Sequence, residues 1–156
     1  MKKCKFPTQR IIERERSYVV ACDEPEKFPD LIRETRLIPE IGGFKFGPTL
    51  TGREGYDKIV SVSRSYTNKP FIFDGQKLGT DTPSMAYKIL KPIKESGFNA
   101  VILFPLSGAE TQIEWTETAQ KIELPVIIGG EMTHEGFERG RGGYFKKEDF
   151  VRMYML

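Results

Sequence analysis

The chain is poor in the residues that build disulfide frameworks and metal clusters. Its 156 residues include two cysteines and one histidine. Cys4 and Cys22 are too few for a disulfide framework, so we expect a reducing, cytoplasmic setting, and the sequence leaves a bond between the two open. The single histidine, His134, excludes a metal site that is built on a pair or cluster of histidines.

Long apolar runs and a strong charge bias are also missing. No run approaches the roughly 20 residues that span a bilayer, and the first residues contain no apolar signal core. The net charge is +2 with 29% charged residues, and acidic and basic side chains alternate along the chain. Because no basic stripe or acidic tail is present, we expect a soluble protein with no membrane partner and no nucleic-acid partner.

Five short apolar runs are typical of strands. They are continuous rather than alternating, as expected for strands that are buried on both faces of a parallel sheet. The runs are residues 18–22, 43–46, 70–73, 100–104 and 125–128. Segments with helical length and period follow them at residues 25–37, 55–66, 84–96, 110–122 and 146–156, and a further short helix is expected around residues 8–16.

This alternation predicts an α/β fold of repeated βα units with a parallel sheet. An open doubly wound sheet and a (β/α)8 barrel both fit, but no G-x-G-x-x-G follows the first run, which weakens the dinucleotide-binding form of the open sheet. Polar residues instead recur at the ends of successive strands. In a barrel these ends meet at one mouth, where barrel enzymes keep their active sites. The polar positions are Asp23, Lys45, Asp74, Lys77, Ser107 and residues 131–134.

The number of strands is small for a barrel, which has eight. We therefore expect a TIM (β/α)8-type barrel of which about five to six βα units are present, as a single partial barrel domain over residues 1–156. Three explanations stay open: a piece of a longer chain, a natural short form, or a partial barrel that a partner completes. An incomplete barrel leaves strand edges unprotected, which favours association.

Residues 70–83 carry the chemistry that the sequence predicts. An apolar strand delivers Asp74, Lys77 and Asp81 to its carboxyl end. Each carboxylate favours the ammonium form of the lysine, and crowding of the two anions stores repulsion that a reaction can relieve. The alternative interpretation of this spacing is a surface ion pair after an ordinary strand.

Five segments in order resemble the orotidine 5′-monophosphate decarboxylase superfamily. The most specific are FIFDGQKLGTDTP at 71–83, which resembles the signature D-x-K-x-x-D-I-P, and GEMTHEGF at 130–137, which resembles E-M-S-H-P-G. Weaker matches are VVACD at 19–23, GGFKFG at 42–47 and GFNAVILFPLSG at 97–108. The chain has one more residue than the signature on each side of Lys77, and it resembles a divergent archaeal-type branch.

The resemblance implies that CO2 is removed from C6 of orotidylate to give uridylate, in pyrimidine nucleotide biosynthesis, with no cofactor and no metal. Charge that develops at C6 is stabilised by a neighbouring cation. By analogy, Lys77 supplies that charge and then the proton, and Asp74 lies near the departing carboxylate. Asp81 holds Lys77 charged and reaches towards the ribose across the interface of a homodimer.

The substrate-binding residues that the resemblance implies are Asp23 and Lys45, which bond ribose hydroxyls, and Thr133, which contacts the pyrimidine. Two other functions stay open. One is a sugar-phosphate synthase or lyase of the same superfamily, whose members use Mg2+ and keep a Glu in the region of the second and third strands, where this chain has Lys45 and Asp74. The other is a noncatalytic barrel that binds a nucleotide.

Overall fold

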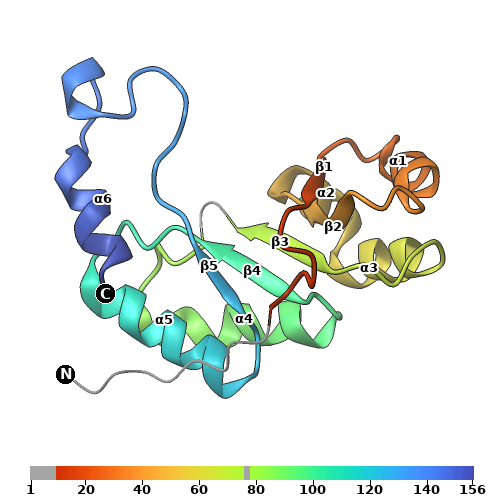
Figure 1. The fold of residues 1–156 in the computed structure, drawn as a ribbon. Helices are drawn as coiled ribbons and strands as arrows, with labels where there is room; N and C mark the ends of the chain where they lie inside the picture. The colour runs from red at the N-terminus through yellow and green to blue at the C-terminus, as the bar shows by residue number, and fades with distance from the viewer. Residues whose placement is uncertain (1–9, 76–77) are drawn as a thin grey trace.

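A computed structural model describes residues 10–75 and 78–156. Its centre is a five-stranded parallel sheet in the order β1-β2-β3-β4-β5 (Figure 1). The strands are β1 (Tyr18–Cys22), β2 (Ile41–Phe46), β3 (Phe71–Gly75), β4 (Ala100–Leu103) and β5 (Val126–Ile128). Each strand that the sequence predicts is present, and the α/β class is confirmed.

The strand order distinguishes between the two predicted architectures. Every strand pairs in parallel with the next strand along the chain. A doubly wound sheet reverses its strand order at a switch point, whereas a barrel adds each strand beside the previous one. The sheet therefore has the topology of a (β/α) barrel, of which five strands are described.

Helices connect the strands and continue past the last one. They are α1 (Phe28–Thr35), α2 (Pro48–Glu54), α3 (Tyr56–Arg64), α4 (Ala86–Glu95), α5 (Ala109–Lys121) and α6 (Lys147–Tyr154), with single 3-10 turns η1 (Pro83–Met85) and η2 (Arg139–Arg141). Within the part of the chain that the structure describes, none of these helices has the length and apolar character that crossing a membrane requires.

Two helix predictions need correction. The helix α2 is not predicted from the sequence, because Pro48 and Gly52 within seven residues are typical of a loop. Pro48 stands in the first turn of α2, where a missing N–H costs nothing and the fixed φ suits a helix.

The helix that we expect around residues 8–16 is wrong over its described part, since residues 10–16 contain no helix. Arg14 donates a hydrogen bond to the carbonyl of Pro39, and the side chain of Ile12 lies against Gly42. Tertiary contacts at the amino-terminal end of β2 thus hold the segment in a bent form.

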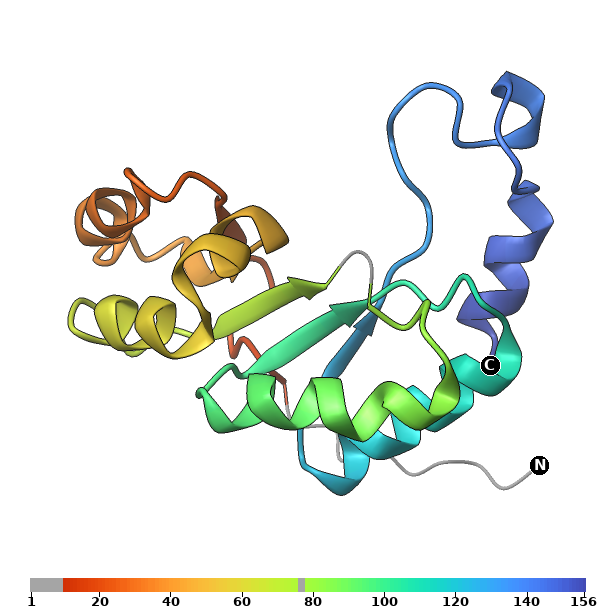
Figure 2. The ribbon, with the colours of Figure 1, turned by 180° about the vertical axis from the view of Figure 1, so that it is seen from behind.

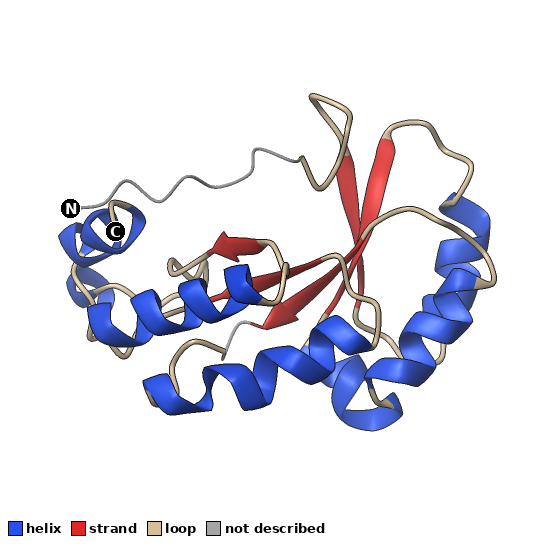
Figure 3. Ribbon diagram, turned by 90° about the horizontal axis from the view of Figure 1, so that it is seen from below, coloured by secondary structure: helices blue, strands red, loops and turns tan. Residues whose placement is uncertain are grey.

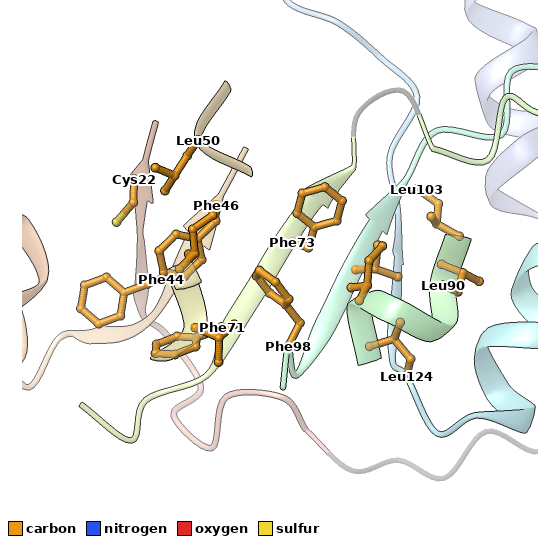
Figure 4. Close-up of a cluster of buried hydrophobic side chains, with 14 of the residues drawn as sticks. Cys22, Phe44, Phe46, Leu50, Phe71, Phe73, Leu90, Phe98, Leu103 and Leu124 are labelled. Atoms are coloured by element: carbon orange, nitrogen blue, oxygen red, sulfur yellow. The ribbon is translucent and has the colours of Figure 1, made fainter. Parts of the chain in front are cut away.

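A phenylalanine-rich core joins the sheet to its helices. Figure 3 shows the helices along one side of the strands, and Figure 4 shows the buried side chains between them. The ring of Phe46 meets those of Phe71 and Phe98 edge to face, with centroids 5.4 and 6.0 Å apart. Such contacts between aromatic rings add to the free energy of burial. The apolar residues of β2 and β3 therefore pack one face of the sheet against the helices.

The opposite face of the sheet carries the alternate residues of each strand, because side chains alternate along a strand. This inner face includes Val19 and Ile127, which are 37% and 38% exposed. It also includes Lys45 and Asp74 near the carboxyl ends of β2 and β3. The sheet thus separates an apolar outer face from an inner face that is charged at one end.

At the amino-terminal end of β3, one asparagine connects three elements. The Asn99 amide oxygen accepts hydrogen bonds from the Phe71 backbone N–H, at 2.8 Å, and from the Arg64 guanidinium, at 2.9 Å. That guanidinium lies over the Phe71 ring, 3.7 Å from its centroid. Burial lowers the pKa of Arg64. Asn99 therefore satisfies a strand donor and fixes α3 against β3 and β4.

Asn99→Ala should lower the free energy of unfolding by about 1–3 kcal/mol, because the Phe71 N–H and the Arg64 guanidinium lose their shared acceptor. Urea denaturation monitored by circular dichroism measures the change. Asn68→Ala is the matched control, since Asn68 is exposed and we expect a change below about 0.5 kcal/mol. Equal losses in both variants would contradict this assignment.

Candidate active site

The central feature of the inner face is an ion pair between β2 and β3. Lys45 Nζ donates to Oδ2 of Asp74. Lys45 is opposite Ile72 in the strand register, so Asp74 lies two residues further towards the carboxyl end of β3. The Asp74 side chain is 6% exposed and that of Lys45 is 28% exposed. Both charges therefore lie at the edge of the sheet where barrel enzymes hold their substrates.

One oxygen of Asp74 has no partner among the described residues. Oδ1 is buried and accepts no hydrogen bond from any described residue. A buried acceptor without a donor carries a desolvation cost that a paired acceptor avoids, and such groups are uncommon in folded proteins. Asp74 is thus fixed by Lys45 through one oxygen and open to a further donor through the other.

The predicted proton donor, Lys77, lies outside the described residues, and so does Gln76. The chain on both sides is described. The Leu78 backbone N–H donates to the Gly75 carbonyl at 2.7 Å, and the Phe104 N–H donates to the Leu78 carbonyl at 2.8 Å. Gly75 and Leu78, the described residues on either side of this pair, are therefore anchored at the carboxyl end of β3, next to Asp74.

Asp81 lies on the loop between β3 and η1. Its exposed carboxylate accepts a hydrogen bond from the backbone N–H of Thr82, at 2.6 Å. The loop is held from α5, since Trp115 Nε1 donates to the Thr82 carbonyl at 3.2 Å and Thr111 Oγ1 to the Asp81 carbonyl at 3.4 Å. No described contact joins Asp81 to Asp74, so its predicted interaction with Lys77 stays a prediction.

Asp23 follows β1 and lies beside the end of β2. The register pairs Cys22 with Phe46, so Asp23 and Gly47 are neighbours on the next rung. Oδ1 of Asp23 is 2.6 Å from the point that a Cβ would occupy at Gly47. The carboxylate therefore lies across the end of β2, two residues beyond Lys45. The sequence assigns no role to Gly47, although this residue ends the segment GGFKFG that resembles the second strand of the superfamily.

Cys22, next to Asp23, faces the core instead. It is a free thiol with 1% exposure. Burial raises its pKa to about 12, and the charge of Asp23 acts in the same direction. A nucleophilic cysteine needs a low pKa and access to solvent, so Cys22 has a structural role. Cys4 lies outside the described residues.

Thr133 belongs to the long segment between β5 and α6. It is exposed and lines a cavity of about 340 Å³ together with other residues of the same segment, including His134, Phe137 and Arg141. Figures 1 and 2 show this segment extending away from the sheet beyond β5. No described contact brings Thr133 to Lys45 or Asp74, and its pyrimidine contact stays a prediction.

The site has acidic and basic groups but no cluster that suits a metal ion. Among the described residues, no three His, Cys, Asp or Glu side chains lie close enough to share a cation. The ammonium of Lys45 occupies one oxygen of Asp74, which leaves a single carboxylate oxygen at that position. Asp74 and Lys45 therefore form a site that is suited to hydrogen-bonding and charge stabilisation.

The fold and the position of this ion pair define a (β/α) barrel protein with a charged site at the carboxyl ends of its strands. Solved structures with the same fold include the orotidine 5′-phosphate decarboxylase of Pyrococcus horikoshii OT3, at 21% identity and a TM-score of 0.66. The match covers 87% of this chain and 60% of that one. The orotidine 5′-monophosphate decarboxylase of Methanocaldococcus jannaschii is 20% identical with a TM-score of 0.71, covering 88% of this chain and 63% of that one.

The Methanocaldococcus jannaschii enzyme is also solved in complex with the inhibitor BMP. That structure is 21% identical with a TM-score of 0.67, and the match covers 78% of this chain and 55% of that one. This chain thus spans less than two thirds of the length of each of these relatives. No family model and no curated protein sequence matches it. The resemblance that the motifs indicate is confirmed for the fold.

Lys45→Met should lower the free energy of unfolding by about 1–3 kcal/mol, because the buried Asp74 carboxylate loses its cation. The expected loss is smaller than for a fully buried pair because the Lys45 side chain is 28% exposed. Chemical denaturation measures it.

Lys58→Met provides the control, because Lys58 pairs with Glu54 on the surface of the molecule and its side chain is 66% exposed. We expect that change to cost about 0.5 kcal/mol or less. A Lys45→Met variant as stable as Lys58→Met would contradict the account of Asp74 as a buried anion that depends on its partner.

Proposed function

We propose that the chain is an orotidine 5′-phosphate decarboxylase-like carboxy-lyase that converts orotidylate to uridylate and CO2. The observation that carries this proposal is the Lys45–Asp74 ion pair at the carboxyl ends of adjacent strands, in a fold shared with solved decarboxylases. The motif resemblance over residues 71–83 adds Lys77 and Asp81 to the same strand end.

The chemistry requires charge rather than a cofactor. Loss of CO2 leaves negative charge at C6, which an ammonium group stabilises more in the transition state than in the ground state. Lys77 supplies that ammonium and then transfers its proton to C6. Asp74 Oδ1, which has no described donor, is the acceptor that holds Lys77 in place.

Lys45 has a separate task in this mechanism. Its ammonium fixes Oδ2 of Asp74, so that the carboxylate presents Oδ1 in one orientation. Preorganisation of this kind reduces the rearrangement that the reaction would otherwise need. Asp23 and Lys45 lie at the ends of neighbouring strands and bind the ribose hydroxyls of the substrate.

The Mg2+-dependent relatives are a less suitable model for this site. Mg2+ needs several oxygen ligands around it, and an ammonium group in contact with the central carboxylate repels a divalent cation. Lys45 holds that position beside Asp74. The ion pair therefore favours decarboxylation without a metal.

Asp81 fits the role of a residue that acts across a dimer interface. It is exposed. Among the described contacts, its carboxylate accepts a hydrogen bond only from the backbone N–H of Thr82, in the same turn. In the proposed homodimer, Asp81 reaches the ribose and Lys77 of the neighbouring subunit. The dimer and the cytoplasmic location stay predictions.

Lys77→Ala should reduce turnover of orotidylate by about 10³-fold or more, because both the stabilising charge and the proton donor are lost. The loss of orotidylate absorbance in the ultraviolet measures the rate. Lys88→Ala on α4 is the matched control, since Lys88 is exposed and outside the site, and we expect its rate to be unchanged.

Near-normal turnover by Lys77→Ala would contradict the assigned role of Lys77. Loss of wild-type activity on addition of EDTA would favour the Mg2+-dependent sugar-phosphate function. Folded wild-type protein that binds uridylate without turning over orotidylate would indicate a noncatalytic nucleotide-binding barrel.

A further inference from the structure

We propose that Gly47 is a positioning residue for substrate binding. Because Gly47 lacks a side chain, the Asp23 carboxylate can lie across the end of β2, beyond Lys45 on the same strand. In this position the carboxylate can accept a hydrogen bond from a ribose hydroxyl of the substrate. This inference rests on the proposed function, which assigns a ribonucleotide to the site.

The strand register places these residues in one row across the inner face. Cys22 pairs with Phe46, and Phe46 pairs with Phe73. On the next rung, Asp23, Gly47 and Asp74 therefore lie side by side at the ends of β1, β2 and β3. Neighbouring strands are about 4.8 Å apart, so the two aspartates are separated by roughly 10 Å of backbone with Gly47 in the middle.

The charged groups of this row suit a ligand that carries hydroxyl groups. A carboxylate accepts hydrogen bonds only, and an ammonium donates them, so Asp23 and Lys45 together can satisfy hydroxyls that both donate and accept. Lys45 lies two residues before Gly47, so alternation places both residues on the same face of the sheet. Gly47 thus lies between an acceptor, Asp23, and the Lys45–Asp74 ion pair.

The backbone conformation of Gly47 does not require glycine. Its φ of −90° and ψ of 174° describe an extended backbone that any residue can adopt. What requires glycine is space. Apart from the two chain neighbours of Gly47, the only described atoms within 4 Å of an added Cβ are Oδ1 and Cγ of Asp23, at 2.6 and 3.7 Å. An alanine at this position would therefore displace the Asp23 carboxylate and nothing else.

The test is a double-mutant cycle on the complete chain with Gly47→Ala, Asp23→Ala and the double variant. Isothermal titration with uridylate measures affinity, and thermal unfolding measures the steric contact without a ligand. Gly52→Ala is the matched control, because no described atom outside its chain neighbours and its own helix backbone lies within 4 Å of a Cβ at Gly52.

We expect Gly47→Ala to weaken uridylate binding by about tenfold and to lower the melting temperature by roughly 2–4 °C. In the Asp23→Ala background, the same change should alter affinity by less than about twofold and leave the melting temperature unchanged, because the displaced carboxylate is gone. Gly52→Ala should bind uridylate like the wild type.

Equal effects of Gly47→Ala in both backgrounds would overturn the inference, since Gly47 would then act independently of Asp23. An unchanged affinity in Gly47→Ala would overturn it as well. If the wild type binds no uridylate, the proposed function and the ligand role of Gly47 both fail. In that case, coupling between Gly47 and Asp23 in the melting temperatures would still show the steric contact. Failure of the proposed function is therefore distinguishable from failure of the contact between Gly47 and Asp23.

Discussion

The sequential parallel pairing of the five strands is the constraint on which the rest of the structure depends. Because each strand lies beside the next one along the chain, every strand ends at the same edge of the sheet. Asp23, Lys45 and Asp74 come from segments that are far apart in sequence, and this pairing alone places them in neighbouring positions. The position of the site therefore follows from the topology, before any interaction between the side chains is considered.

Side chains alternate along β2 and β3, so one face of the sheet packs against the helices and the other carries the charged residues. Phe44, Phe46, Phe71 and Phe73 are buried against the helices and hold the sheet in place. The residues between them face inwards, where burial of Asp74 costs free energy unless a cation is near. Lys45 supplies the cation to one oxygen, and the other oxygen has no partner in the part of the chain that the structure describes. Burial of the phenylalanines on the outer face thus stabilises the fold and offsets the cost of burying the Asp74 carboxylate on the inner face.

Much of this arrangement could be predicted from the sequence. Continuous apolar runs identify the strands, and the polar residues that follow them identify the edge of the sheet where the charged side chains lie. The bond between Lys45 and Asp74 could not, because the sequence places Asp74 closer to Lys77, and only the register brings Lys45 within reach. The bend at residues 10–16 and the helix α2 depend on tertiary contacts and on a single proline. The space at Gly47 has no local signal, since its cause is a side chain on another strand.

The central claim is that a nucleotide binds at the carboxyl ends of β2 and β3. Backbone amide NMR spectra recorded during titration with uridylate test it most directly, because each backbone N–H reports on its own surroundings. The account predicts that the largest shifts occur at Lys45, Gly47, Asp74 and Gly75. Shifts confined to the cavity of about 650 Å³ between α5 and α6, which Gln112 and Met153 line, would contradict it.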